Sequence, residues 1–266
     1  MTNTVLLECV DGVATITLNR PAQLNALSVE MMEDLHQTVR AVRADSGTKV
    51  IVVTGAGEHF MAGGDLNDFA RQLHLDAPAR LVAFRAMIER HINPTVETMQ
   101  SLPQPIVAKV RGACAGFGLS LMLGCDLAVC ADNTKFTTAY ASIGLPADGG
   151  MSYLLPRAVG ARKAMELLLL GDRFDAGEAQ RLGLVNRVVP QDALDAEVAA
   201  LVERLKHGPR GTYAEIKRLV AASFDAKLES QLQSEAEAFA RCSASPDFDE
   251  GIKAFLGKRK AVFGGC

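Results

Sequence analysis

The chain has 266 residues, of which 48% are hydrophobic and 22% are charged, and its formal net charge is -3. This length and composition predict a globular protein with one large core, or a core and an appendage. The balanced charge argues against nucleic-acid binding, and no apolar run is long enough to predict a membrane span.

The first predicted elements are a strand and a helix. Residues 13–18 place every second side chain on one face, as a half-buried strand does, and Arg20-Pro21 ends the pattern. Ser28 is then predicted to cap a helix whose apolar side chains recur four residues apart, at Met31, Leu35 and Val39.

Three short apolar runs follow, at residues 49–55, 105–110 and 127–130. Their continuous, largely β-branched composition is typical of strands that are covered on both faces. Helical patterns lie between them, at residues 80–100 and 119–123. Strands that alternate with helices predict an α/β fold.

The β signal ends at Val188-Val189-Pro190, and the rest of the chain is almost entirely helical in pattern. We therefore predict a boundary near residue 200. Residues 1–200 would form the catalytic core, and residues 201–266 would form a helical appendage.

Six cysteines are scattered along the chain without CxxC spacing. Several lie in apolar runs, which predicts buried free thiols in a reducing compartment. No His or Cys pair has the spacing of zinc ligands, so no metal is predicted. The N-terminal ten residues lack the pattern of a secretory signal, and these features together predict a cytoplasmic protein.

Two glycine-rich segments, residues 60–66 and 111–120, each follow a predicted strand and precede a helix. The first could be a plain strand-to-helix loop or a close backbone approach to a ligand. The second is not a dinucleotide fingerprint, because the third glycine would fall at Leu121, and it lacks the P-loop and GxSxG patterns. A turn that presents backbone N–H groups at a helix start remains, and such a turn suits an oxyanion.

A third glycine-rich segment, residues 143–151, places Asp148 between Pro146-Ala147 and Gly149-Gly150, directly before an apolar helical stretch. An aspartate in this position usually caps the helix. Considered together with the other two segments, it also becomes a candidate for chemistry.

In this order the segments resemble the crotonase (enoyl-CoA hydratase/isomerase) superfamily, and the resemblance covers nearly the whole chain. The matching marks are Asn19-Arg20-Pro21 with Asn25-Ala26-Leu27, residues 62–66, Gly112 with residues 115–118, Cys125-Asp126, Gly144-Leu145 with Asp148-Gly149-Gly150, residues 155–160, Ala179 with residues 183–185, and residues 254–256 with Lys258-Arg259.

The resemblance implies a spiral core of ββα units and C-terminal helices that assemble trimers or hexamers. The substrate would be an acyl-CoA thioester, and coenzyme A would enter as part of it, without a separate cofactor. The oxyanion hole falls on the N–H groups of Gly64 and Phe117. Adenine would be bound around Ala62, Asp65 and Leu66, and Lys258 would serve the ligand of a neighbouring subunit.

The chain departs from the hydratase pattern at two positions. Those of the two hydratase glutamates fall on Ser120 and Tyr140, neither of which can act as a carboxylate base. Ser120 is expected to line the pocket. Tyr140 could donate a hydrogen bond or only bound the acyl cavity, and the second role is favoured.

Asp148 aligns with the aspartate of dienoyl-CoA isomerases and of phenylacetate-pathway isomerases. A single acid suffices for a 1,3-proton shift, so we predict an enoyl-CoA double-bond isomerase in which Asp148 is the acid/base. The alternatives are a hydratase, thioester hydrolysis, a ring-modifying isomerase and a non-catalytic acyl-CoA-binding protein.

Overall fold

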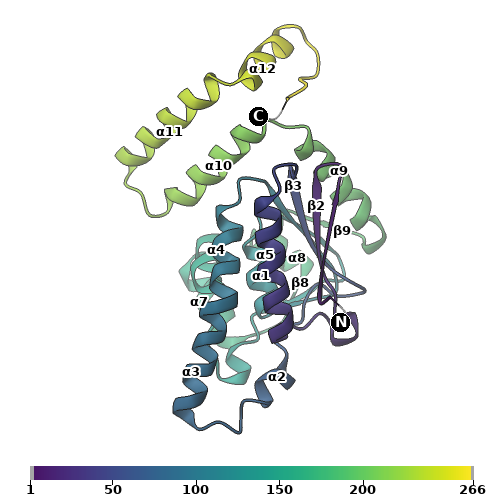
Figure 1. Ribbon diagram of the computed structural model, residues 1–266, viewed down its shortest axis with the longest axis vertical. Helices are drawn as coiled ribbons and strands as arrows, with labels where there is room; N and C mark the ends of the chain where they lie inside the picture. Colours follow the sequence, from purple (N-terminus) through teal and green to yellow (C-terminus); the bar gives the residue numbers. More distant parts are fainter. Residues whose placement is uncertain (1–2, 265–266) are drawn as a thin grey trace.

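A six-stranded sheet forms the centre of the molecule, with the strand order β1-β2-β3-β4-β6-β9 (Figure 1). The computed structural model describes residues 3–264. β1 and β2 pair antiparallel, and all the other neighbours in this sheet pair parallel. The strands are β1 (Val5–Val10), β2 (Val13–Leu18), β3 (Val50–Gly55), β4 (Ile106–Val110), β6 (Leu127–Ala131) and β9 (Arg187–Val189).

The central strand β3 is covered on both faces, as its sequence predicts. Val50 and Val52 pack into a cluster with the helix α9 (Leu194–Lys206), whereas Ile51 and Val53 pack into the main core with α1 (Val29–Ala44). Figure 1 shows these two helices on opposite sides of the sheet. Because successive side chains of a strand alternate between faces, one continuous apolar run supplies both layers.

The predicted helices are also confirmed. Ser28 caps α1, since its hydroxyl accepts a hydrogen bond from the N–H of Met31 at 3.2 Å. The pattern at residues 80–100 corresponds to α3 (Ala77–Met87), the π-helical turn η2 (Ile88–Ile92) and α4 (Asn93–Ser101), which follow one another without a break. The remaining helices of the core are α2 (Leu66–Ala70), α5 (Phe117–Leu123), α6 (Met151–Val159), α7 (Ala161–Leu170) and α8 (Ala176–Arg181), with short 3-10 turns η1 (Pro21–Gln23), η3 (Ala141–Ile143) and η4 (Gln191–Ala193).

A second, three-stranded sheet holds one of the glycine-rich segments. It has the order β5-β7-β8, from β5 (Ala113–Ala115), β7 (Lys135–Thr137) and β8 (Phe174–Asp175). Met61 extends it through an isolated parallel bridge to Cys114. This small sheet therefore brings residues 60–64 alongside residues 113–116.

The last three helices form an arm that projects from the core: α10 (Arg210–Ser223), α11 (Leu228–Ser243) and α12 (Pro246–Leu256) (Figure 1). The boundary predicted at residue 200 falls inside α9, which packs on the sheet, and the arm begins after it. The division into two domains stays a prediction.

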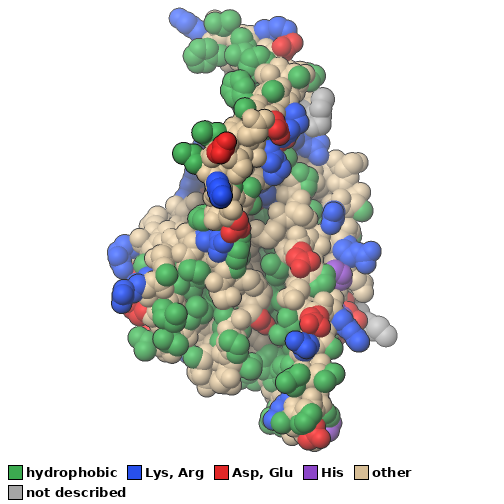
Figure 2. Space-filling view, turned by 90° about the vertical axis from the view of Figure 1, so that its left-hand side faces the viewer, with side chains coloured by type: hydrophobic (Ala, Val, Ile, Leu, Met, Phe, Trp, Pro, Cys, Tyr) green, Lys and Arg blue, Asp and Glu red, His purple; other side chains and the backbone are tan. Residues whose placement is uncertain are grey.

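Large apolar side chains of the arm are exposed, and Figure 2 shows hydrophobic side chains along it. They include Ile216, Val220, Phe224, Leu228, Leu232, Phe239, Ile252 and Phe255. Across residues 3–264, no helix combines the length and the apolar character needed to span a bilayer.

The thiols in the apolar runs are largely buried, as predicted. Cys114 and Cys130 are buried, Cys125 is half-buried, and none of the five described cysteines forms a disulfide. Cys9 is exposed, and Cys266 lies outside the described residues.

Candidate active site

The first two glycine-rich segments touch each other through their backbones. The N–H of Ala115 donates to the carbonyl of Met61 at 2.9 Å, which aligns the two chains. A Cβ atom added to Gly116 would lie 3.3 Å from the Cα of Gly63, and Gly116 has a φ of +50°. Both the contact and the conformation therefore favour glycine.

The residues directly after these two glycines are Gly64 and Phe117, and within residues 3–264 neither backbone N–H has an acceptor. Leu27 bridges to this strand through the carbonyl of Gly63 and the N–H of Asp65, so the N–H of Gly64 between them stays unpaired. Phe117 is the first residue of α5, where a helix has no internal acceptor. The two donors predicted for an oxyanion hole thus lie on touching segments.

The third segment packs on the helix that begins at Phe117. A Cβ atom added to Gly149 would lie 2.7 Å from the Phe117 ring, and Gly149 has a φ of +60°. The hydroxyl of Ser120 donates to the backbone carbonyl of Asp148 at 2.9 Å. These contacts hold Asp148 next to the start of α5.

Tyr140 donates a hydrogen bond from its hydroxyl to Oδ1 of Asp148 at 2.5 Å, and the Ser120 hydroxyl lies 3.2 Å from the same Tyr140 oxygen. The favoured interpretation of Tyr140 as only a wall of the cavity was therefore wrong. Oδ2 of Asp148 accepts no hydrogen bond from any other residue between 3 and 264. Asp148 also does not cap α6, because the N-cap of α6 is Gly150, with no side-chain cap bond.

The environment of Asp148 favours its protonated form. Burial raises the pKa of Asp148, and the hydrogen bond from Tyr140 opposes this rise only in part. Burial and the nearby charge of Asp148 raise the pKa of Tyr140, so its hydroxyl stays protonated and can donate. A carboxyl group with a raised pKa and one oxygen without a partner can both accept and return a proton.

Asp65 has a structural role as well as its predicted place near adenine. Its carboxylate is 2.8 Å from the guanidinium of Arg20, and it accepts from the N–H of Asn67 to cap α2. Burial alone would raise the pKa of Asp65, but these two hydrogen bonds hold it below its usual value.

The N–H groups of Ala62 and Asp65 are already paired, since they donate to the carbonyls of Leu24 and Leu27. An adenine contact through Ala62 would therefore use its carbonyl oxygen, which suits the exocyclic amine as donor. Lys258 is not brought to this site within one chain, because it follows α12 at the far end of the molecule from α2 (Figure 1). These adenine and phosphate roles stay predictions.

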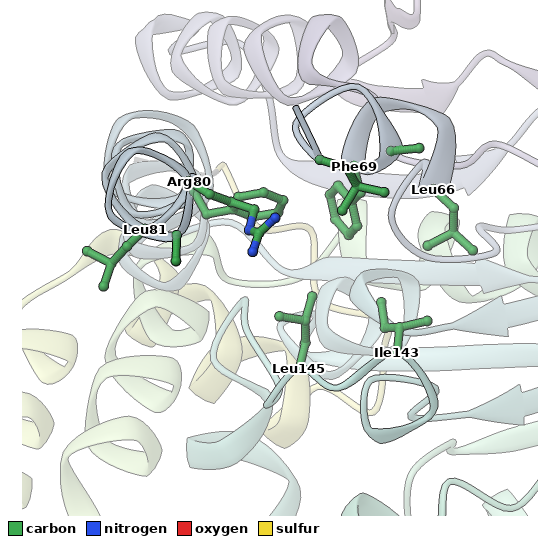
Figure 3. Close-up of a pocket in the computed structure, with 10 residues that line it drawn as sticks. Leu66, Phe69, Arg80, Leu81, Ile143 and Leu145 are labelled. Carbon is green, nitrogen blue, oxygen red and sulfur yellow. The ribbon is translucent and has the colours of Figure 1, made fainter. Parts of the chain in front are cut away.

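An apolar cavity of about 540 Å³ lies beside these segments. Leu66, two residues after Gly64, forms one wall, and Leu145, three residues before Asp148, forms another (Figure 3). The other lining residues come from α2, α3, η3 and the segment joining α2 to α3: Phe69, Ala70, Leu73, Ala77, Arg80, Leu81, Phe84 and Ile143. Sequence analysis did not single out Phe69, Arg80 or Leu81, although the apolar side chains on the short, otherwise polar α2 are a usable signal.

Comparison with known proteins gives whole-chain matches. Residues 8–265 match the family model described as Enoyl-CoA hydratase/isomerase. The 1,2-epoxyphenylacetyl-CoA isomerase of Escherichia coli is 35% identical over 261 residues, which is 98% of each chain. A protein of Rhodobacter capsulatus named "Probable enoyl-CoA hydratase" is 34% identical over 264 residues, which is 99% of this chain and 98% of its own.

A crystal structure from Mycobacterium abscessus, of the enoyl-CoA hydratase/isomerase type, superposes with a TM-score of 0.93 at 37% identity. The superposition covers 98% of this chain and 100% of the other. It confirms the fold that the sequence predicts.

Proposed function

The chain belongs to the enoyl-CoA hydratase/isomerase family, and we propose that within this family it is a double-bond isomerase of enoyl-CoA thioesters that uses Asp148 as its acid/base. One observation carries this proposal. Asp148 has a raised pKa, and its Oδ2 accepts no hydrogen bond from another residue within 3–264. It is also packed against the segment that bears the N–H of Phe117, which has no acceptor in the same range.

The proposed reaction moves one proton from the α- to the γ-carbon of a 3-enoyl thioester. Oδ2 of Asp148 removes the α-proton, and the electron pair spreads into the thioester carbonyl and the 3,4 double bond as a dienolate. The N–H groups of Gly64 and Phe117 donate to its oxygen, where one such donor is worth roughly 3–4 kcal/mol. Asp148 then returns the proton to the γ-carbon, and the carbonyl and a 2,3 double bond form.

The neighbours of Asp148 favour this reaction over hydration. A hydratase of this family uses two carboxyl groups, and Ser120 and Tyr140 occupy those positions. Both are hydrogen-bonded with Asp148 itself, Ser120 to its backbone and Tyr140 to its carboxylate. The relatives include one named as an isomerase and one named as a probable hydratase, so the proposal rests on the site residues and not on the relatives' names.

The test compares wild type with Asp148→Asn on 3-enoyl-CoA and 2-enoyl-CoA thioesters. Wild type should convert 3-enoyl to 2-enoyl thioester, and Asp148→Asn should lower that rate by about 10²- to 10⁴-fold. Asp225→Asn is the matched control, because Asp225 also accepts a tyrosine hydroxyl, that of Tyr153, but does so on the surface. Unchanged isomerisation by Asp148→Asn would refute the role of Asp148.

Mass spectrometry of the same reactions separates the alternatives. Addition of water to the 2-enoyl thioester at a higher rate than isomerisation would identify a hydratase. Release of free coenzyme A would identify a thioester hydrolase. Tight binding without turnover or exchange of the α-proton for deuterium would identify a binding protein.

We also propose that the exposed apolar arm assembles the chain into trimers, alone or paired as hexamers. Exposed apolar side chains such as Phe239 and Phe255, which are 76% and 82% exposed, support an interface there. The proposal places Lys258 against the coenzyme A phosphates of a neighbouring subunit. Light scattering tests the assembly, and a rise in KM for Lys258→Ala without a change in mass tests the contact.

A further inference from the structure

Arg80 is the one charged residue among those that line the apolar cavity. Its side chain extends from α3, and Figure 3 shows the guanidinium reaching toward the middle of the cavity, with Phe69 and Leu145 around it. The residue is half-buried. Across residues 3–264, no carboxylate forms an ion pair with Arg80 and no oxygen accepts a hydrogen bond from its side chain.

The neighbouring arginines make this absence informative. Arg71, just after α2, pairs with Asp68 at 2.7 Å, and Arg85, also on α3, pairs with Glu89 at 3.5 Å. Both of these arginines are exposed, so their partners contribute little to stability. Arg80 lies deeper, against apolar side chains, and within residues 3–264 it has no such partner.

A guanidinium in such a place has lost part of its hydration without a replacement. Its planar fork matches a carboxylate, which it can bind through two parallel hydrogen bonds. The surrounding leucines and phenylalanines match a hydrocarbon chain. Together they are complementary to an alkyl chain that ends in a carboxylate.

The cavity lies where such a chain would extend. Its walls at Leu66 and Leu145 continue directly from the segments that hold Gly64 and Asp148. A volume of about 540 Å³ is within the range of small-ligand sites. An acyl group whose thioester oxygen lies at Gly64 and Phe117 would therefore direct its far end toward Arg80.

We propose that this cavity holds the distal part of the acyl group and that Arg80 binds a carboxylate at its end, so that the preferred substrates are CoA monothioesters of unsaturated dicarboxylic acids. This inference rests on the proposed function, because it places the acyl group by the site of its isomerisation. It adds the substrate class.

The experiment uses pairs of 3-enoyl-CoA thioesters of equal length that differ only in a terminal methyl or carboxylate. The wild-type enzyme should prefer the carboxylate member by about tenfold to hundredfold in kcat/KM, as expected for one charge-assisted pair. Arg80→Leu should abolish or invert this preference, mainly through KM, and Arg80→Lys should restore part of it. Arg85→Leu is the matched control and should leave it unchanged, since Arg85 is exposed and is not among the cavity-lining residues.

Two results would overturn the proposal. If Arg80→Leu weakened both members of a pair equally, Arg80 would bind the coenzyme A phosphates common to them. If it changed neither, the guanidinium would serve only as a solvated side chain or as a contact within the assembly.

Direct binding keeps this test separate from the isomerase proposal. The corresponding saturated thioesters cannot isomerise, and calorimetric titration measures their affinities even if the enzyme catalyses another reaction. The same selectivity for the carboxylate, lost in Arg80→Leu, would support the role of Arg80 whichever reaction occurs. Equal affinities of wild type for both saturated thioesters would refute it.

Discussion

The site has two halves, of which one supplies backbone groups and the other supplies a side chain. Gly64 and Phe117 contribute backbone N–H groups, which are positioned by the contact between Gly63 and Gly116. Asp148 contributes a side chain, which is positioned by Tyr140 and Ser120.

This difference determines how each half can be changed. Every residue type except proline carries a backbone N–H. Substitutions near the backbone half therefore change the position of the donors and not their chemistry. Substitutions in the side-chain half alter charge and pKa while the backbone stays in place. Variants of each kind should therefore leave different signatures in kinetics and in stability.

Among variants that leave Asp148 in place, the largest effect is expected for Gly116→Ala. The new Cβ would press on the Cα of Gly63, at 3.3 Å, and the φ of +50° strains any L side chain. Displacing one donor should lower kcat/KM by about 10²- to 10³-fold, with little shift of the pH profile. Steady-state kinetics across pH measures both quantities.

The control for this prediction is Gly183→Ala. Gly183 has a φ of +75°, yet a Cβ there would meet nothing within 4 Å. It should lose about 1 kcal/mol of stability and keep its activity. Full activity in a folded Gly116→Ala variant would contradict a role for the N–H groups of Gly64 and Phe117 in the reaction.

A smaller effect, of another kind, is expected for Tyr140→Phe. The hydrogen bond from Tyr140 lowers the pKa of Asp148, so its removal should raise that pKa further. Asp148 must be ionised to accept a proton, and the acid limb of the kcat/KM profile should move to higher pH. The rate near neutral pH should fall by about tenfold and recover as the pH rises.

Tyr153→Phe is the matched control for Tyr140→Phe, because its hydroxyl donates to Asp225 on the surface, and its profile should match wild type. An acid limb that stays in place or moves to lower pH in Tyr140→Phe would contradict the role assigned to this hydrogen bond.

The smallest effect is a gain in stability for Asp148→Asn. Burial raises the folded-state pKa of Asp148 above its unfolded value of about 3.9, so ionising this carboxyl disfavours the folded state. That cost is absent below the unfolded pKa and complete above the folded one. The gain in Tm over wild type should therefore be absent in acid and should grow as the pH rises through that interval.

Calorimetry in a series of buffers measures the stability of Asp148→Asn against wild type. A lower Tm for Asp148→Asn at neutral pH would mean that the ionised carboxylate stabilises the fold. That result would contradict the cost assigned to ionising Asp148. A gain of a few degrees would place this residue among those that sacrifice stability for function.

Parts of the fold were readable from the sequence because their patterns are local. The strand β2 alternates and buries Ala14, Ile16 and Leu18, and the helix α1 begins at its predicted cap, Ser28. β1 was not predicted, since it pairs at the sheet edge with five of its six residues exposed, so its burial creates no alternating pattern. A strand that forms by pairing with a neighbour, and that buries few side chains, leaves no apolar pattern from which it could be predicted.

The site divides in the same way. The sequence by itself determined the family, the three glycine-rich segments and the candidates Gly64, Phe117 and Asp148, because these depend on residue types in a fixed order. Only the tertiary structure decided that Gly63 touches Gly116, that Tyr140 donates to Asp148 and that Arg80 lines an apolar cavity. Each of these facts depends on the direction of a side chain or on residues distant in the chain, and packing alone sets both.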